Sequence, residues 1–270
     1  MSGKEIRLSK IIKPSDGRTV SIAVDHGLSD GVLEGIEDMN RLFHEIGPNV
    51  DAVLINAGII RTNSKILSQQ ELGIIMRVDI AYLPETKNEF MINTLSGSVE
   101  RALRLGAHAV AANGFLGHDY AFDSITNLSL FAESCEQWGM PLVAEMKYVG
   151  KDISEPWRPK YVENGVRVAH EVGADLVKTY YTGDKSSFKT IVENSAIPIA
   201  ILGGPRKKSI RDVLKAVEDA VDAGAVGVIF GRNVWHKRDA AKMSRVLYRI
   251  IHENISADEA IKEENLMEEY

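Results

Sequence analysis

The sequence predicts an α/β fold of the (β/α)8 class, a TIM barrel that forms a single domain over residues 1–270. The prediction rests on a unit that recurs from about Thr19 onward, in which a short apolar run precedes a polar turn and a longer segment of helical spacing. Eight such runs occur, which is the number of strands that closes this barrel. The runs are almost continuously apolar, as in parallel strands that are buried on both faces. An open, doubly wound sheet is the alternative arrangement.

The predicted helices lie between these runs. Apolar residues recur at i, i+3 and i+4 in Tyr120–Trp138, Arg158–Val172 and Ser209–Ala223. Glycine follows helical segments at Gly106 and Gly173, as is typical of a helix C-cap. The predicted strands are, in chain order, Thr19–Asp25, Asp51–Asn56, Gly73–Asp79, His108–Asn113, Pro141–Lys147, Ala174–Lys178, Pro198–Gly203 and Gly227–Gly231.

Two segments depart from the repeat. Ile80–Phe90, after the third strand, is longer than a usual turn, and we expect it to form a lid or an extra hairpin. The tail from about residue 252 is acidic and contains no clear strand, so we expect a helix on the surface or at an oligomer contact. Nothing resembles a linker rich in proline or serine, which leaves a single domain.

Composition limits the partners. Lys and Arg total 32 against 38 acidic residues, and the formal net charge is -6, which argues against nucleic acid or an anionic membrane as the main partner. A single cysteine, Cys135, allows no intrachain disulfide, and the first ten residues contain no apolar stretch that could act as a signal sequence. No apolar run approaches the ~20 residues that span a bilayer. We therefore expect a soluble, cytoplasmic protein.

A lysine at the end of the sixth predicted strand is the most informative residue. In this fold the active site lies at the carboxyl ends of the strands, where Lys178 follows Ala174-Asp175-Leu176-Val177. Burial and a neighbouring cation lower the pKa of a lysine, and the free amine can then attack a carbonyl to form a Schiff base. The alternative is a lysine that extends along the rim to solvent.

Other polar residues end neighbouring strands. Asp25 could act as a general base or cap the next segment, and His26 could transfer a proton. Strand alternation places Glu145 and Lys147 on one face and Tyr148 on the other. A Glu145 that points inward would hold nearby lysines charged and so oppose the pKa decrease expected of a Schiff-base lysine.

The last two strand ends suit a phosphate. Gly203 and Gly204 let backbone N–H groups approach an anion, and Gly231 and Arg232 precede a predicted helix, whose N-terminus favours negative charge. Tight turns are the alternative reason for these glycines. The seven histidines form no HExxH or Cys/His cluster, and no GxSxG serine elbow occurs, so we predict no metal and no cofactor.

These motifs, taken together and in this order, resemble the archaeal-type class I fructose-bisphosphate aldolase family. The family includes 2-amino-3,7-dideoxy-D-threo-hept-6-ulosonate synthase and the thiolase of autoinducer-2 phosphate breakdown. The resemblance is carried, from about Leu8 to Ile251, by Asp25-His26-Gly27, by Gly173–Lys178 with Tyr181-Thr182-Gly183-Asp184, by Gly203-Gly204-Pro205 and by Gly231–Trp235.

The resemblance implies a metal-independent barrel in which Lys178 forms the Schiff base and Asp25 assists proton transfer. It also implies that the loops with Gly203-Gly204 and Gly231-Arg232 hold a substrate phosphate. His26 would follow Asp25 as an acid/base residue, as in the thiolase branch. Members often assemble as a decamer of two stacked rings, so the resemblance implies a homo-oligomer, with a decamer as one form of it.

One departure concerns the fifth strand. Aldolase members have Tyr-Pro-Arg-Gly there, with the tyrosine as acid/base, but ungapped alignment places Lys147 at that position and Tyr148 one residue later. Either a local shift lets Tyr148 serve, or Lys147 transfers the proton, or the chemistry differs. Val149-Gly150-Lys151-Asp152 resembles the thiolase branch, whereas Ala132–Pro141 and Gly17–Val20 resemble the heptulosonate synthase branch.

The leading hypothesis is a Schiff-base aldolase or transaldolase of carbohydrate metabolism that acts on a phosphorylated ketose such as fructose 1,6-bisphosphate. The first alternative is lysine-dependent acyl transfer to coenzyme A from a phosphorylated diketone. The second is a non-catalytic barrel that binds a sugar phosphate.

Overall fold

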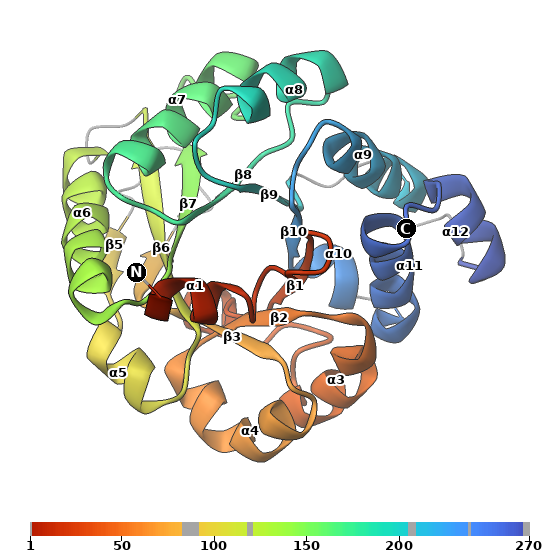
Figure 1. Cartoon of the computed structure of the whole chain (residues 1–270), viewed down its shortest axis with the longest axis horizontal. Coiled ribbons are helices and arrows are strands. Elements are labelled where there is room, and N and C mark those ends of the chain that lie inside the picture. Colours follow the sequence, from red (N-terminus) through yellow and green to blue (C-terminus); the bar gives the residue numbers. More distant parts are fainter. Residues whose placement is uncertain (1, 83–91, 118–120, 205–208, 237–238, 267–270) are drawn as a thin grey trace.

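The computed structural model describes residues 2–82, 92–117, 121–204, 209–236 and 239–266. All eight predicted strands are present and form one closed barrel, in the order β1-β10-β9-β8-β7-β6-β3-β2 (Figure 1). The prediction of a (β/α)8 barrel is confirmed, and the open sheet is excluded because β1 pairs with both β2 and β10. The strands are parallel and comprise β1 Thr19–Ala23, β2 Ala52–Ile55, β3 Gly73–Arg77, β6 Ala109–Leu116, β7 Leu142–Tyr148, β8 Leu176–Thr179, β9 Ile199–Leu202 and β10 Gly227–Phe230.

Helices surround the barrel and bury their apolar faces against it (Figure 1). Several begin at a side chain that accepts a backbone N–H of the first turn, such as Asp184 from Ser187 N at 2.7 Å and Ser209 from Asp212 N at 3.1 Å. The three helices predicted from spacing are found as α6, α7 and α9. The outer helices are α3 Met39–Ile46, α4 Ala57–Gln69, α5 Val99–Arg104, α6 Ala121–Trp138, α7 Pro159–Glu171, α8 Lys185–Glu193, α9 Ile210–Asp222 and α11 Ala240–His252.

The expected extra hairpin is present beside the barrel. Strands β4 (Asp79–Tyr82) and β5 (Ile92–Leu95) pair in antiparallel fashion between β3 and α5. The lid alternative concerns residues 83–91, which lie outside the described residues. The acidic tail forms the predicted helix, α12 (Ala257–Glu263), which packs on α9 and α11. Within the described part of the chain, no helix is long and apolar enough to cross a bilayer.

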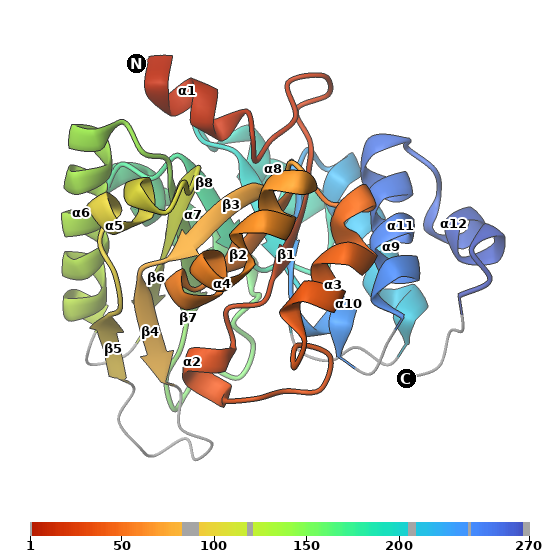
Figure 2. The same cartoon turned by 90° about the horizontal axis from the view of Figure 1, so that it is seen from below.

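The two ends of the barrel differ. Helix α1 (Ser2–Leu8) and the residues after it cover the amino-terminal end, where the fully buried Ile11 joins the apolar cluster inside the barrel. A Cβ at Gly73 would lie 2.2 Å from the Lys10 carbonyl oxygen, so the close approach of this cover requires glycine. Helix α2 (Gly27–Asp30), the hairpin and α10 (Arg232–Trp235) lie at the opposite end (Figure 2). The carboxyl ends of the strands are therefore where a site can form.

Side-chain alternation determines what faces the interior. Leu176 of β8 and Val143 of β7 belong to the apolar cluster inside the barrel. Two residues further along, at the mouth, the same inward face presents Lys178 and Glu145. The sequence thus places an apolar layer of side chains inside the barrel and a polar layer at the carboxyl ends of the strands.

A histidine whose side chain is 7% exposed ties the end of α11 to the amino-terminal end of the barrel. The Nδ1 atom of His252 lies 2.6 Å from Asp16 Oδ2, and its Nε2 atom lies 2.9 Å from Asp51 Oδ2. Asp51 Oδ2 also accepts a hydrogen bond from Val20 N at 2.6 Å. Burial alone would lower the pKa of His252, but the hydrogen bonds to Asp51 and Asp16 outweigh it and raise the pKa.

This raised pKa predicts a pH-dependent contribution to stability. The charged His252 stabilises the folded state fully below its ordinary pKa of about 6.5, and the contribution disappears as pH rises through the higher folded-state pKa. His252→Gln should therefore lower the free energy of unfolding more at about pH 6 than at about pH 9, because the wild type has lost the charge at the higher pH. Urea unfolding at both values measures this, and an equal loss at both would contradict it.

Candidate active site

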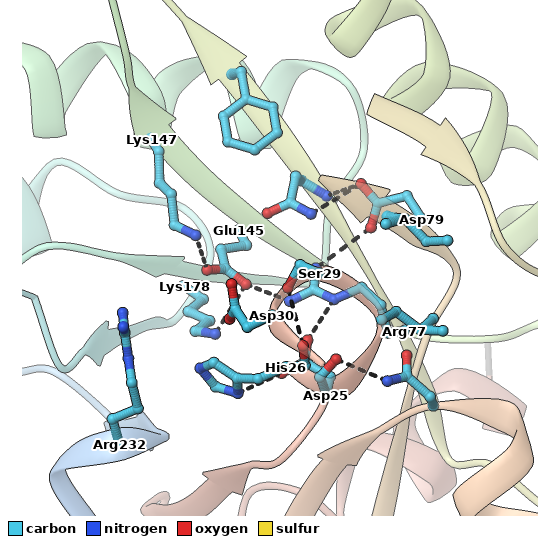
Figure 3. Close-up of a pocket in the computed structure, with 15 residues that line it drawn as sticks. Asp25, His26, Ser29, Asp30, Arg77, Asp79, Glu145, Lys147, Lys178 and Arg232 are labelled. Carbon is cyan, nitrogen blue, oxygen red and sulfur yellow. Dashed lines mark hydrogen bonds and ion pairs between the residues drawn. The ribbon is translucent and has the colours of Figure 1, made fainter. Parts of the chain in front are cut away.

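A polar cavity of about 310 Å³ opens at the carboxyl ends of the strands. Its walls come from most of the barrel strands together with α2, β4 and α10 (Figure 3). Among the predicted site residues, Asp25, His26, Lys147, Lys178 and Arg232 line it. The other lining residues are Leu28, Ser29, Asp30, Asn56, Arg77, Asp79, Ile80, Asn113, Phe115 and Glu145.

Lys178 points into this cavity and is 6% exposed, so it does not extend along the rim to solvent. It is paired in register with Glu145 of β7, and its Nζ donates to Glu145 Oε2 at 2.9 Å. Burial lowers the pKa of Lys178, and the opposing carboxylates of Glu145 and Asp25 do not restore it. The amine is therefore closer to its neutral, nucleophilic form than an exposed lysine.

The pKa of Lys147 is shifted in the opposite direction. Its Nζ forms an ion pair with Glu145 Oε1, on the same inward face of β7. Burial alone would lower the pKa of Lys147, but the Glu145 carboxylate outweighs it and raises the pKa. The pKa of Glu145 lies well below its ordinary value, because the attraction of Lys147, Lys178 and Arg77 exceeds the cost of burial. One carboxylate thus adjoins a charged lysine and a lysine with a lowered pKa.

Arg77 lies at the centre of the site. Its Nε donates to Asp25 Oδ2 at 2.7 Å, its Nη1 lies 3.5 Å from Asp79 Oδ1, and its Nη2 bonds Glu145 Oε2 (Figure 3). The guanidinium is 7% exposed and remains charged, since these carboxylates raise its pKa despite burial. Asp79 Oδ2 in turn accepts from Asn113 N and Nδ2 at 2.9 and 3.0 Å.

Asp25 and His26 leave β1 next to this arginine. Burial would raise the pKa of Asp25, but Arg77 lowers it, so the carboxylate is ionised. Burial lowers the pKa of His26, whose ring meets Trp235 edge-on at a centroid distance of 5.2 Å. The buried Nδ1 atom of His26 has no hydrogen-bond partner among the described residues and lies 3.6 Å from Asp25 Oδ1. A neutral imidazole with an unused nitrogen suits proton transfer.

Asn56 adds a second unused polar atom to the wall. Its Nδ2 donates to the backbone oxygen of Asp25 at 2.7 Å, which fixes the orientation of the amide. Its Oδ1 is buried and, within the described part of the chain, has no hydrogen-bond partner. A substrate hydroxyl would satisfy this acceptor.

Tyr148 does not line the cavity. Strand alternation directs it outward, where its ring stacks on Tyr161 of α7 at 4.4 Å and its hydroxyl accepts from Asn164 Nδ2 at 3.2 Å. The predicted division of β7 is confirmed, with Glu145 and Lys147 inside. The local shift that would bring Tyr148 to the substrate is absent.

The predicted phosphate-binding residues do not all line the same cavity. Arg232 points into the cavity from α10, and among the described residues no carboxylate lies within ion-pair distance of it. Gly203 and Gly204 instead line a second cavity, of about 430 Å³, with Tyr180 and Tyr181. The two loops meet where Asn233 Nδ2 donates to the Gly203 carbonyl oxygen at 3.0 Å. Residues 205–208, which follow Gly204, lie outside the described residues.

Gly231 is explained by close packing. A Cβ at this position would lie 2.6 Å from His26 Cε1, so a side chain here would displace the imidazole.

The carboxylates of the site surround Arg77. Among the residues that the structure describes, no group of three or more His, Cys, Asp or Glu side chains could hold a metal ion.

Residues 19–237 match the model of the DeoC/LacD family aldolases. The chain belongs to this family. Among family relatives, the chain is 31% identical to the 2-amino-4,5-dihydroxy-6-oxo-7-(phosphonooxy)heptanoate synthase of Streptomyces griseus, over 92% of this chain and 90% of that one. It is 33% identical to 2-amino-3,7-dideoxy-D-threo-hept-6-ulosonate synthase 1 of Archaeoglobus fulgidus, over 99% and 98% of the two chains. It is 33% identical to the 3-hydroxy-5-phosphonooxypentane-2,4-dione thiolase of Escherichia coli, over 96% and 85%.

Solved structures of fructose-1,6-bisphosphate aldolases agree with this assignment. A Schiff-base-forming fructose-1,6-bisphosphate aldolase superposes with a TM-score of 0.80 at 28% identity, over 93% of this chain and all of that one. An archaeal fructose 1,6-bisphosphate aldolase superposes with a TM-score of 0.79, over 92% and 98%. The resemblance to the archaeal-type class I aldolases is therefore confirmed, and the protein is an enzyme of the class I, Schiff-base aldolase type. The non-catalytic alternative is not supported.

The sequence gives no role in the predicted site to Arg77, Asp79 and Asn113, and it places Glu145 on the inward face near the lysines without counting it as a catalytic residue. The available signal was strand alternation, because Arg77 and Glu145 each follow a buried inward residue by two positions. Asp79 had a weaker signal, since it belongs to the extra hairpin and not to a barrel strand.

The central position of Arg77 predicts a large cost for its removal. Arg77→Met leaves Asp25, Asp79 and Glu145 buried without their shared cation, and the free energy of unfolding should fall by about 3–5 kcal/mol. Urea unfolding at neutral pH measures it. Arg158→Met, which removes an exposed pair with Glu155, is the matched control and should change stability little. Equal, small losses in both variants would contradict the central role of Arg77.

Proposed function

We propose that the protein makes or breaks a carbon–carbon bond in a phosphorylated ketose through a Schiff base on Lys178. The observation that carries the proposal is Lys178 itself, a buried lysine with a lowered pKa at the mouth of a barrel of the aldolase family. A buried, partly neutral amine is the nucleophile that attack on a ketone requires.

The proposed reaction begins with attack of the Lys178 amine on the substrate ketone. A proton shift gives a neutral carbinolamine, and protonation of its hydroxyl releases water and leaves a cationic iminium. Removal of a proton from the β-hydroxyl then breaks the neighbouring carbon–carbon bond, which releases an aldehyde and leaves an enamine. Protonation of the enamine carbon and hydrolysis return the amine and the second product.

Lys147 is the proposed acid in place of the family's tyrosine. It occupies the aligned position, lines the cavity and has a raised pKa, so it is an ammonium that can donate to the carbinolamine hydroxyl. After donation, the neutral amine can accept the proton of the β-hydroxyl. Tyr148, which faces α7, is not part of this proposal. Asp25 and His26 are proposed to assist proton transfer from the opposite side of Lys178.

The substrate phosphate is proposed to bind at the last two loops. Arg232 supplies the charge, with Gly231 beside it and with the backbone of Gly203 and Gly204 across the Asn233 contact. The names of three relatives each contain a phosphorylated ketone: a phosphonooxy-oxoheptanoate, a phosphonooxypentanedione and fructose 1,6-bisphosphate. These names support a phosphorylated ketone in the proposed substrate, which we propose to be a ketose, with fructose 1,6-bisphosphate as one candidate.

Borohydride trapping tests the proposal. Reduction with dihydroxyacetone phosphate, fructose 1,6-bisphosphate or fructose 1-phosphate should attach the ketose to Lys178 as a secondary amine. The added mass, measured by intact mass and peptide mapping, is that of the ketose plus two hydrogens less one water. Lys178→Ala should abolish the adduct. Lys185→Ala, at an exposed lysine paired with Asp222, should trap as the wild type does. Absence of an adduct with every ketose phosphate would overturn the proposal.

Acyl transfer to coenzyme A is the second candidate function. It is favoured by the identity to the thiolases and by Val149-Gly150-Lys151-Asp152 after β7, together with the unused nitrogen of His26. An acyl-coenzyme A product that requires free coenzyme A would distinguish it from aldol cleavage. Cytoplasmic location and assembly as a homo-oligomer stay predictions.

A further inference from the structure

We infer that a single carboxylate, Glu145, serves both lysines of the site. Its Oε1 atom holds Lys147 as the ammonium acid, and its Oε2 atom is the counter-ion of the iminium that forms on Lys178. The inference rests on the proposed function and gives a defined role to a residue that the sequence only places on the inward face near the lysines.

The two carboxylate oxygens have different partners. Oε1 pairs with Lys147, whereas Oε2 accepts from Lys178 at 2.9 Å and from Arg77. The Glu145 side chain is 5% exposed, and its strand is paired in register with both β6 and β8. Neither lysine can therefore exchange its partner oxygen without a movement of the other or of Arg77.

A charge argument explains why the iminium needs Glu145. Schiff-base formation turns a neutral amine into a cation in a site shielded from water, and an unpaired buried charge is costly. Glu145 Oε2 is already at hydrogen-bond distance from the nitrogen that becomes charged. Lys147, Lys178 and Arg77 keep this carboxylate ionised, so Glu145 acts through its charge and does not take up the proton itself.

Other ionisable groups face the two lysines but do not have this geometry. The acidic groups are Asp25, which follows β1, Asp30 of α2 and Asp79 of β4. The basic groups are Arg77 of β3 and Arg232 of α10. His26 lies beside Asp25, and Tyr180 follows β8 near Lys147. Among these described groups, Glu145 is the carboxylate within ion-pair distance of both Nζ atoms.

The test is the pH dependence of iminium formation in Glu145→Gln. In the wild type, the rate of adduct formation with dihydroxyacetone phosphate and cyanoborohydride should fall at low pH as Lys178 gains a proton, and at high pH as Lys147 loses one. These two decreases are the acidic and the alkaline limb of the pH–rate profile. Without the carboxylate both lysines lose protons more readily, so both limbs should move to lower pH. At an alkaline pH where the wild type is still active, the variant should be slower by about tenfold or more.

Asp79→Asn is the matched control. It also removes a buried carboxylate beside Arg77, but Asp79 has no ion pair with either lysine among the described residues, so the alkaline limb should stay in place. The rates of variant and wild type are compared at each pH, which cancels the pH dependence of the reductant. Glu145→Asp keeps the charge but shortens the side chain, and it should shift the alkaline limb less than Glu145→Gln and in the same direction.

The outcomes separate the inference from the function on which it rests. A Glu145→Gln variant that traps more slowly with an unmoved alkaline limb has lost structure alone, and this would overturn the inference while Schiff-base chemistry stands. An equal shift in Asp79→Asn would overturn it too, since any buried carboxylate would then suffice. If Glu145→Gln does not fold, an alkaline limb that stays in place in Glu145→Asp would likewise overturn the inference. A wild type without a Lys178 adduct would overturn the proposed function first.

Discussion

The burial of one guanidinium among carboxylates organises the mouth of this barrel. Arg77 carries a charge at a position shielded from water, which is tolerated because Asp25, Asp79 and Glu145 surround it. The contact with Arg77 lowers the pKa of Asp25, and together with Lys147 and Lys178 it keeps Glu145 ionised. The positions of the Asp25 and Glu145 oxygens, which the proposed proton transfers and the proposed counter-ion use, therefore depend in part on a residue that need not touch the substrate.

The barrel explains why these charges meet. Residues two apart on a strand share a face, so the inward line of each strand runs from the apolar interior to its carboxyl end. Parallel pairing then places Asn113, Glu145 and Lys178 side by side on β6, β7 and β8. This regularity is why the fold, the eight strands and the roles of Lys178 and Lys147 as cavity residues could be predicted from the sequence alone.

Features that depend on side-chain reach could not be predicted in that way. Strand alternation placed Glu145 inward, but the length of Arg77 decides that its three nitrogens reach carboxylates from β1, β4 and β7. Asp79 enters the site through an inserted hairpin that the eightfold repeat does not contain. Gly203 and Gly204 line a cavity other than the one with Lys178, and a glycine pair does not by itself specify which cavity it lines.

The departure on β7 has a chemical consequence for the proposed reaction. A phenol donates a proton and becomes an anion, whereas an ammonium donates a proton and becomes neutral. With Lys147 as donor, iminium formation transfers a positive charge from Lys147 to Lys178, so the total charge around Glu145 does not change. A tyrosine in the same place would instead create a new anion and a new cation. A lysine acid therefore requires an adjacent permanent carboxylate, and Glu145 and Lys147 are best understood as a pair that replaces the phenol together.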